Sequence, residues 1–370
     1  MELTQLRGEI DEVDKELHRL FIKRMELCYG VAEYKIANSL PVFQKGREKE
    51  VLERVAERSP DDLKGASRVF YQNMMDISKC MQYQKFFADS NSIEYEKLDL
   101  SGRHKVAVPG TVGSYNHLAC SRIFDVFEPV FKEEFGDVFR SVQNGETEFG
   151  ILPIVNSTAG SVVRTYELLR EYDLKICAVT KLRISHILAV RPGVKFEDIK
   201  AVYSHEQGLW QCSEFIKKHN LRTHKYSNTA LAAAYIRQSK EPLGAICSKD
   251  CAGELGLEIL RTDIANATDN FTRFILVSKK TLKSENANTI SVCLSLPHQS
   301  SSLYRLLTKF SVAGLNLSMI ESMPIANTDF DVLFYLDFHG AIDTPEVAKL
   351  LDELRDELTY FKFLGNYEEM

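Results

Sequence analysis

The most informative stretch of the chain reads Asp269-Asn270-Phe271-Thr272-Arg273-Phe274-Ile275-Leu276-Val277-Ser278. Residues 274–277 form an unbroken apolar run and predict a buried strand. Thr272 and Arg273 stand where that strand begins, and open α/β sheets bind ligands at strand ends. A hydroxyl and a guanidinium can together donate to a carboxylate and to a second oxygen. A surface ion pair is the alternative for Arg273, so the flanking regions decide between the two.

The composition is that of an ordinary globular protein with more than one domain. The chain has 370 residues, 44% of them hydrophobic and 26% charged, enough for two or three domains. A formal net charge of −6 argues against nucleic acid as the main partner. The sequence shows no membrane-spanning run, and its first residues lack the features of a signal peptide. We therefore expect a cytoplasmic protein that does not bind membranes.

The cysteines are scattered and suggest neither disulfides nor metal binding. Eight are present, and two of them, Cys247 and Cys251, are spaced C-x3-C without a nearby histidine or a second pair. Small buried thiols are therefore favoured over a zinc site. We expect no disulfide, no metal and no cofactor.

Residues 1–88 predict an all-helical region. Apolar residues recur there every three or four positions, as in a long amphipathic helix that packs against other helices. They are Leu3, Leu6, Ile10, Val13, Leu17, Leu20, Leu27 and Val31. Arg24 stands in this stripe where leucine is favoured, and a charge facing a helical interior is costly unless it is paired or functional. A solvated basic edge is the alternative, but it does not suit an arginine inside the stripe.

Two further helices are predicted in this region, at 46–57 and 66–87, and the region resembles the all-helical chorismate mutases over essentially its whole length. The matching pieces are Leu6-Arg7, Lys23-Arg24-Met25-Glu26-Leu27, Lys35, Pro41-Val42, Arg47-Glu48 and Ser78-x-x-x-Gln82. The rearrangement of chorismate to prephenate is pericyclic. It needs only a pocket that folds the substrate and stabilises charge on its ether oxygen.

The resemblance assigns roles within this catalytic set. Arg7 from a partner subunit, Arg24 and Ser78 would hold the two carboxylates of the substrate. Lys35 and Gln82 would face the ether oxygen, and Glu48, with Arg47 beside it in the motif, would bind the ring hydroxyl. Gln44 departs from the acidic residue often found four positions before Glu48, which bears on hydroxyl recognition.

Residues 104–280 predict an α/β region. Short apolar runs are followed by small or hydroxyl residues and then by a helical pattern, which argues for a mostly parallel sheet with capped helices. The runs are 106–108, 150–154, 201–203, 223–226 and 244–247. Backbone amides at such helix starts bind anions. Gly110-x-x-Gly113-Ser114 lacks the lysine of a phosphate loop and the third glycine of a dinucleotide fingerprint, so a small carboxylate ligand fits better than a nucleotide.

This region resembles prephenate dehydratase across about 175 residues. The matches are Gly113-Ser114-Tyr115-x-His117-x-Ala119, Leu152-Pro153-Ile154, Asn156-Ser157-Thr158-Ala159-Gly160-Ser161-Val162, Ser204-His205-x-Gln207 and Asn270-Phe271-Thr272-Arg273-Phe274. The resemblance implies two α/β lobes like those of periplasmic binding proteins, with the site in the cleft. It implies that Thr272 donates a proton to the leaving hydroxyl of prephenate. The residues implied to bind and orient the substrate are Asn156, Ser157, Thr158, Gln207 and Arg273.

Two features of this region leave alternatives open. Val155 stands where the family usually has glutamate, so the dehydratase half is either active without that acid or crippled. His117 and His205 could act as bases, but at helix starts a structural role in bonding the backbone is favoured.

Residues 288–370 predict a βαββαβ module. Strands are expected at 289–295, 317–322, 332–338 and 360–364, and helices at 302–312 and 345–358. The module resembles the ACT domain that follows prephenate dehydratases and binds phenylalanine between paired subunits. The regulatory residues implied are Ser301, Leu303, Asn316, Leu317, Glu321 and Ser322. Ser301 stands where glycine is usual and Met323 where arginine is usual, which predicts weak phenylalanine inhibition.

The sequence therefore predicts a multidomain protein. An all-α chorismate mutase (1–88) precedes a two-lobed α/β prephenate dehydratase (104–280) and an α+β ACT module (288–370). We expect a homodimeric enzyme of phenylalanine biosynthesis that acts on chorismate and prephenate and responds to phenylalanine. Two alternatives remain open: an active mutase fused to a non-catalytic sensor of prephenate or amino acids, and a mutase that passes prephenate to another enzyme.

Overall fold

The fold is described from a computed structural model covering residues 2–42, 45–87, 93–267, 269–325 and 332–370, and the departure at Gln44 lies outside these residues. The chain divides into two compact units. The first comprises Met1–Glu94 and Thr289–Phe363, and the second comprises Tyr95–Asn288 and Leu364–Met370. No helix within the described ranges is long and apolar enough to cross a membrane.

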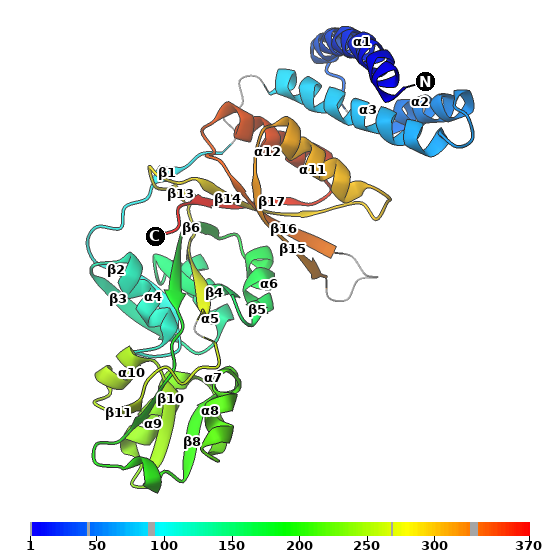
Figure 1. The fold of residues 1–370 in the computed structure, drawn as a ribbon. Coiled ribbons are helices and arrows are strands. Elements are labelled where there is room, and N and C mark those ends of the chain that lie inside the picture. The colour runs from blue at the N-terminus through cyan, green and yellow to red at the C-terminus, as the bar shows by residue number, and fades with distance from the viewer. Residues whose placement is uncertain (1, 43–44, 88–92, 268, 326–331) are drawn as a thin grey trace. The chain divides into compact units, whose positions relative to one another are not determined.

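The first unit begins with the predicted helices. They are α1 (Leu3–Ala37), α2 (Lys45–Arg58) and α3 (Lys64–Phe86), and both α1 and α2 pack on α3 (Figure 1). The apolar stripe of α1 does not pack as predicted within one chain, because its members from Leu3 to Val31 are exposed, Val13 by 58% and Leu17 by 48%. Met25, Ala32 and Lys35 are the buried positions of α1, so a different face of the helix meets α3.

The rest of the first unit is an α+β module. Its elements are β14 (Thr289–Ser295), α11 (Ser302–Val312), β15 (Leu317–Pro324), β16 (Val332–His339), α12 (Pro345–Glu357) and the start of β17 (Phe361–Tyr367). β16 is antiparallel to both β14 and β15. Ile290, Phe310, Phe338 and Leu351 form its core with other apolar side chains. Helices α11 and α12 also pack against α3, which ties this module to the helical region.

The second unit has two α/β lobes. The first lobe holds β2 (His104–Pro109), α4 (Tyr115–Ile123), β3 (Phe127–Lys132), α5 (Phe135–Gln143), β4 (Phe149–Asn156), β5 (Gly160–Ser161), α6 (Val163–Glu171), β6 (Lys175–Arg183) and β12 (Phe271–Ser278). Its strands run in the order β6-β12-β4-β2-β3. The end of β17 adds to β6 through Gly365 and Ile176. Short strands β1 (Glu96–Lys97) and β13 (Leu282–Lys283) pair beside it.

The second lobe is formed by the chain between β6 and β12. It holds β7 (Ile187–Val190), η1 (Phe196–Asp198), β8 (Ala201–His205), α7 (Glu206–Gln211), α8 (Ser213–Lys218), β9 (Arg222–Tyr226), α9 (Thr229–Gln238), β10 (Leu243–Cys247), α10 (Lys249–Glu254) and β11 (Glu258–Arg261). The strand order is β11-β7-β10-β8-β9. In Figure 1 this lobe lies beyond the ends of β6 and β12.

All five predicted strand–helix units of this region contain the expected strand, but the sheets are mixed. The runs β3-β2-β4 and β10-β8-β9 are parallel, whereas β12 is antiparallel to both β4 and β6. The chain leaves the first lobe along β6 and returns along β12, so these connecting strands must run in opposite directions. After the run 150–154, the small and hydroxyl residues form the short hairpin from Asn156 to β5, and the expected helix, α6, begins only at Val163.

Candidate active sites

The first candidate site lies between α1 and α3. Arg24 Nη1 donates a hydrogen bond to Ser78 Oγ and lies 3.4 Å from the carbonyl oxygen of Met74. Ser78 Oγ in turn donates to the same carbonyl at 2.7 Å. The arginine that breaks the apolar stripe of α1 therefore meets the serine predicted to share its substrate contacts. Two donors held this close can bind one carboxylate or two neighbouring ones.

One helical turn further along α3, a second predicted pair comes together. Lys35 Nζ donates to Gln82 Oε1 at 3.1 Å and to the carbonyl oxygen of Val42 at 2.6 Å. Burial lowers the pKa of Lys35, partly opposed by the nearby Cys28 and Glu48. A buried ammonium beside an amide is suited to stabilising negative charge on an ether oxygen.

Glu48 joins this site from α2, and its partners were not predicted. Its side chain is 18% exposed and lies 3.0 Å from Lys79 Nζ. Lys79 also contacts Asp76 at 2.9 Å, and both of these α3 side chains are buried. Asp76 and Lys79 are three residues apart, the spacing of an ordinary ion pair on a helix surface, so the sequence alone gives no reason to expect them buried at the site.

The structure does not bring Arg7 and Arg47 into this group. Arg47 is exposed and pairs with Glu50 on the outer side of α2 at 3.0 Å. Arg7 lies near the start of α1, and 17 residues at a rise of 1.5 Å put it about 25 Å along the helix from Arg24. That separation agrees with a role for Arg7 in another subunit, which stays a prediction.

The second candidate site lies where β12 leaves the second lobe. Asn156 and Thr272 face each other in the β4–β12 pairing, and Asn156 Nδ2 donates to Thr272 Oγ1 at 2.8 Å. The same nitrogen lies 2.7 Å from Asn270 Oδ1, and all three side chains are buried. A donor aimed at Oγ1 stabilises the negative charge that develops when the hydroxyl gives up its proton.

The turn after β4 fixes the Asn156 amide. Its Oδ1 accepts the backbone N–H groups of Thr158 at 3.0 Å and Ala159 at 2.8 Å, so its Nδ2 must point toward Thr272. Ser157 Oγ accepts the N–H of Phe271 at 2.9 Å and thereby ties the turn to β12. Ser157 and Thr158 thus support the geometry of the site in the structure, and substrate contact by either stays a prediction.

Arg273 is directed away from Thr272. Successive residues of a strand point to opposite faces, and Arg273 faces Val155 across the ladder. Its Nε lies 3.2 Å from a carboxylate oxygen of Glu369. Glu369 forms an isolated parallel β-bridge with Val179 of β6. A carboxylate from the C-terminus therefore contacts the arginine beside the valine that replaces the family's usual acid.

The remaining predicted residues lie at helix starts. Gln207 is in the first turn of α7 in the second lobe and is half-buried. His205 Nδ1 accepts the N–H of Gln207 at 3.3 Å, and His117 Nδ1 accepts that of Gly113 at 3.5 Å. Both histidines therefore bond the backbone, as the structural interpretation predicts. Burial lowers the pKa of His117.

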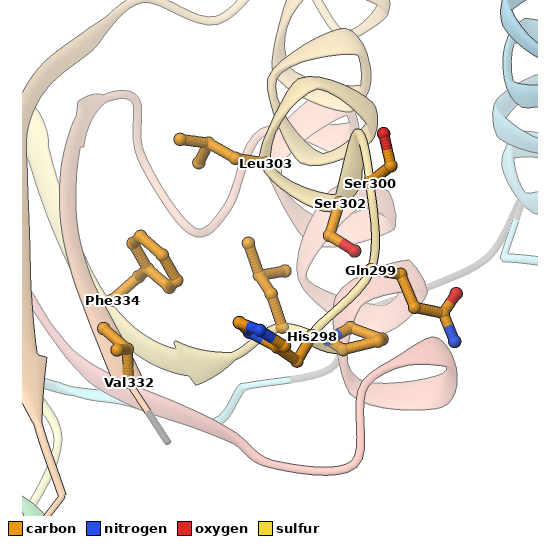
Figure 2. A pocket seen from close by; sticks show the side chains of 9 residues that line it. His298, Gln299, Ser300, Ser302, Leu303, Val332 and Phe334 are labelled. Atoms are coloured by element: carbon orange, nitrogen blue, oxygen red, sulfur yellow. The ribbon is translucent and has the colours of Figure 1, made fainter. Parts of the chain in front are cut away.

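A third feature is a cavity of about 440 Å³ before α11. Figure 2 shows Val332 and Phe334 of β16 across from Ser302 at the start of the helix. Leu303, a predicted regulatory residue, also lines it. Ser301 precedes the helix with φ +68°, a left-handed conformation that glycine adopts at lower cost.

The other predicted regulatory residues divide between the two ends of β15. Ser322 faces Phe334 of the cavity wall, and Glu321 faces Tyr335 beside it. Leu317 faces Phe338 at the far end of the ladder, and Asn316 accepts the N–H of His339 there at 2.9 Å. Ser322 therefore pairs with a residue of the cavity wall, but Glu321, Ser322, Asn316 and Leu317 are not among the residues that line the cavity.

Comparisons with known proteins identify both halves of the chain. A model of the chorismate mutase type II family matches residues 6–83, and one of the prephenate dehydratase family matches residues 106–282. The bifunctional chorismate mutase/prephenate dehydratase of Aquifex aeolicus is 29% identical over 378 residues, covering 99% of this chain and 98% of the relative. Arogenate dehydratase 2 of Petunia hybrida is 33% identical over 282 residues, covering 72% of each chain.

A solved structure agrees with these matches. The prephenate dehydratase from Arthrobacter aurescens, in complex with L-Phe, superposes with a TM-score of 0.65 at 29% identity, covering 71% of this chain and 90% of that one. Fold and sites thus define two enzyme domains on one polypeptide. The chain belongs to the family of bifunctional chorismate mutase/prephenate dehydratases, enzymes of phenylalanine biosynthesis. The family and the two activities expected from the sequence are confirmed.

Proposed function

We propose that the mutase reaction takes place between α1 and α3. Arg24 and Ser78 bind carboxylate oxygens of chorismate and hold the molecule folded. As its ether C–O bond breaks and the new C–C bond forms, Lys35 and Gln82 stabilise the charge on the departing oxygen. The observation that carries this proposal is the meeting of Arg24 with Ser78 and of Lys35 with Gln82, side chains about 50 residues apart in sequence.

The mutase site is completed by a second copy of the chain. The stripe of α1 leaves Leu6, Val13 and Leu17 exposed, and burying such a stripe against an identical helix is the usual use of this pattern. Arg7 lies on the same helix, far from Arg24, where it can enter a partner's site. We therefore propose a homodimer in which Arg7 supplies the remaining carboxylate contact.

The dehydratase reaction centres on Thr272. Its hydroxyl gives a proton to the leaving hydroxyl of prephenate, so that water and carbon dioxide depart and the ring becomes aromatic in phenylpyruvate. The bond from Asn156 to Oγ1 stabilises the resulting alkoxide. Substrate contact by Arg273 stays a prediction, since its side chain points away from Thr272 and pairs with Glu369. No cofactor is required by either reaction.

Residues 288–370 are proposed to bind phenylalanine as an effector at the cavity before α11, with residues 1–88 and 104–280 as the two catalytic domains. The left-handed backbone at Ser301 and the methionine at 323 favour weak binding. The eight free cysteines support a cytoplasmic enzyme.

One experiment tests both catalytic proposals. The purified chain is incubated with chorismate alone, and prephenate and phenylpyruvate are followed separately. We expect prephenate first and phenylpyruvate after it. Prephenate that accumulates without conversion would support a mutase fused to a non-catalytic module, and restoring the usual acid with Val155→Glu would then test the cause.

A further inference from the structure

The helical region and the C-terminal module share a buried network of charges. Arg305 on α11 contacts Asp76 on α3 through both Nε, at 3.2 Å, and Nη2, at 3.1 Å. The same Nη2 lies 3.7 Å from Glu48. A residue of the C-terminal module therefore contacts a carboxylate of the mutase site and the buried aspartate beside it.

Lys79 occupies the centre of this network. Its Nζ lies 3.0 Å from Glu48, 2.9 Å from Asp76 and 3.8 Å from Glu357 on α12. Lys79 and Arg305 thus share the charges of Glu48 and Asp76, whereas Glu357 is also paired with Lys309. Buried carboxylates need compensating charge, so Arg305 supplies charge that Lys79 alone cannot give to both Glu48 and Asp76.

The rest of the contact between α3 and the module is also polar and buried, which makes the network an ordered part of the fold. Lys309 donates to both Glu353 and Glu357, and Tyr83 Oη donates to Asp356 at 2.7 Å. Lys309, Glu353 and Tyr83 are all buried. A network with so many satisfied members holds its side chains in one arrangement.

We infer that Arg305 is a positioning residue for the mutase reaction, acting from the C-terminal module by holding Glu48 in place through Asp76 and Lys79. This inference rests on the proposed role of Glu48 in binding the ring hydroxyl. Without Arg305, Lys79 is the remaining cation for both Asp76 and Glu48, and its contact with Asp76 competes with its contact with Glu48. Glu48 then loses its fixed orientation while Arg24, Ser78, Lys35 and Gln82 stay in place.

The kinetic signature follows from what Glu48 does. A hydroxyl contact is present in the bound substrate and in the transition state, so weakening it raises KM more than it lowers kcat. For Arg305→Ala in the full chain we expect the mutase KM for chorismate to rise about tenfold with kcat changed less than about threefold. A partly unfolded preparation would instead lower the apparent kcat at unchanged KM.

Three comparisons make the test specific. Arg305→Lys keeps the charge but not the two-atom contact with Asp76, so its KM should rise only about threefold. Arg355→Ala removes an exposed arginine from α12 of the same module, one that pairs with Asp352 at 2.8 Å, and should change nothing. In a Glu48→Gln background Arg305→Ala should add less than about twofold, because the two changes remove the same interaction.

Dehydratase kinetics on supplied prephenate complete the test and should stay within about twofold of wild type in every variant. If Glu48→Gln raises the mutase KM but Arg305→Ala does not, the inference is wrong and the proposed function stands. If Glu48→Gln itself has no effect, or the wild-type chain forms no prephenate, the proposed site fails and the inference with it. Equal losses in both activities would show a general loss of folding. If Arg305→Ala does not fold, the mutase KM of Arg305→Lys tests the inference: the expected rise supports it, and an unchanged KM contradicts it.

Discussion

Arg24 is expected to contribute to the mutase reaction and not to the stability of the helices. It occupies a position where packing favours leucine, yet it donates to Ser78 across the helix pair. We expect Arg24→Ala to leave the helices folded and to raise the mutase barrier by about 3–4 kcal/mol, since a preorganised donor to the substrate is lost. Initial rates with chorismate, beside Arg19→Ala as an exposed control on α1, measure this. Near-normal mutase turnover in Arg24→Ala would show that the site is misplaced.

Lys35 predicts a pH dependence. Burial lowers its pKa below the value of an ordinary lysine, so the ammonium loses its proton at lower pH than an exposed lysine would. Mutase activity needs the charged form and should therefore fall as pH rises through this lowered pKa. Lys35→Arg stays charged at high pH and should lose the alkaline fall, whatever its absolute rate. An alkaline limb identical in the two proteins would exclude Lys35 as its source.

Thr272 is the corresponding test in the dehydratase. Thr272→Val keeps the side-chain shape and removes the hydroxyl that Asn156 contacts. Phenylpyruvate formation from supplied prephenate should fall by roughly two to four orders of magnitude if that hydroxyl is the acid. Mutase turnover should not change, and Thr223→Val, on the exposed strand β9, provides a matched control. Retained dehydratase turnover in Thr272→Val would assign the proton to another group.

At the residue scale, the sequence could predict members of the sites but not their partners. Arg24 and Lys35 are recognisable because a charge on a packing helix is unusual. Lys79 and Arg305 were not predicted, because their role depends on a contact between α3 and α11. These helices are more than 200 residues apart in sequence, and no local pattern connects them. Glu369 was not predicted for the same reason, since it reaches Arg273 only because the end of the chain returns beside β6.

At the scale of helices and strands, hydrophobic periodicity predicted where an element lies in the sequence. It did not predict the direction in which a strand runs or what a helix packs against. The strands and helices of 288–370 were predicted within a few residues because each combines a clear period with a turn signal. The antiparallel pairing of β12 was not predicted, because an apolar run carries no information about which strand it pairs with or in which direction. The environment of α1 was missed in a similar way: an amphipathic pattern requires a partner but does not say whether it lies in the same chain.

The apolar stripe of α1 yields a prediction of its own. Leu17→Glu places a charge where the partner helix would pack, while the exposed position leaves the single chain unstrained. We expect mutase activity to fall at least tenfold as Arg7 leaves the partner's site, an effect of about 1.4 kcal/mol or more, with dehydratase activity retained. Sedimentation velocity gives the accompanying change in assembly, and Val126→Glu, which also replaces an exposed aliphatic side chain by an acid, is the control. Full mutase activity in Leu17→Glu would argue against a shared site.

For the molecule as a whole, the proposal that residues 288–370 bind phenylalanine predicts weak binding. The cavity before α11 is bordered by Ser301, which adopts φ +68° where glycine would be unstrained. Met323 is buried on β15, facing Leu333, and cannot supply the charge-assisted bonds that arginine would give a carboxylate, each about 1.5–3 kcal/mol. Ser300 and Ser302 line the cavity and could serve as replacement donors.

Calorimetric titration of phenylalanine into the whole chain distinguishes these possibilities. We expect binding at least tenfold weaker than in the double variant Ser301→Gly with Met323→Arg, a difference of about 1.4 kcal/mol. The glycine frees backbone for the ligand and the arginine offers its carboxylate a partner. Ser318→Gly, an exposed change on β15 at a distance from the cavity, controls for added flexibility. Tight wild-type binding with strong inhibition of phenylpyruvate formation would instead show that serine and methionine suffice, and that the family's glycine and arginine are one solution among several.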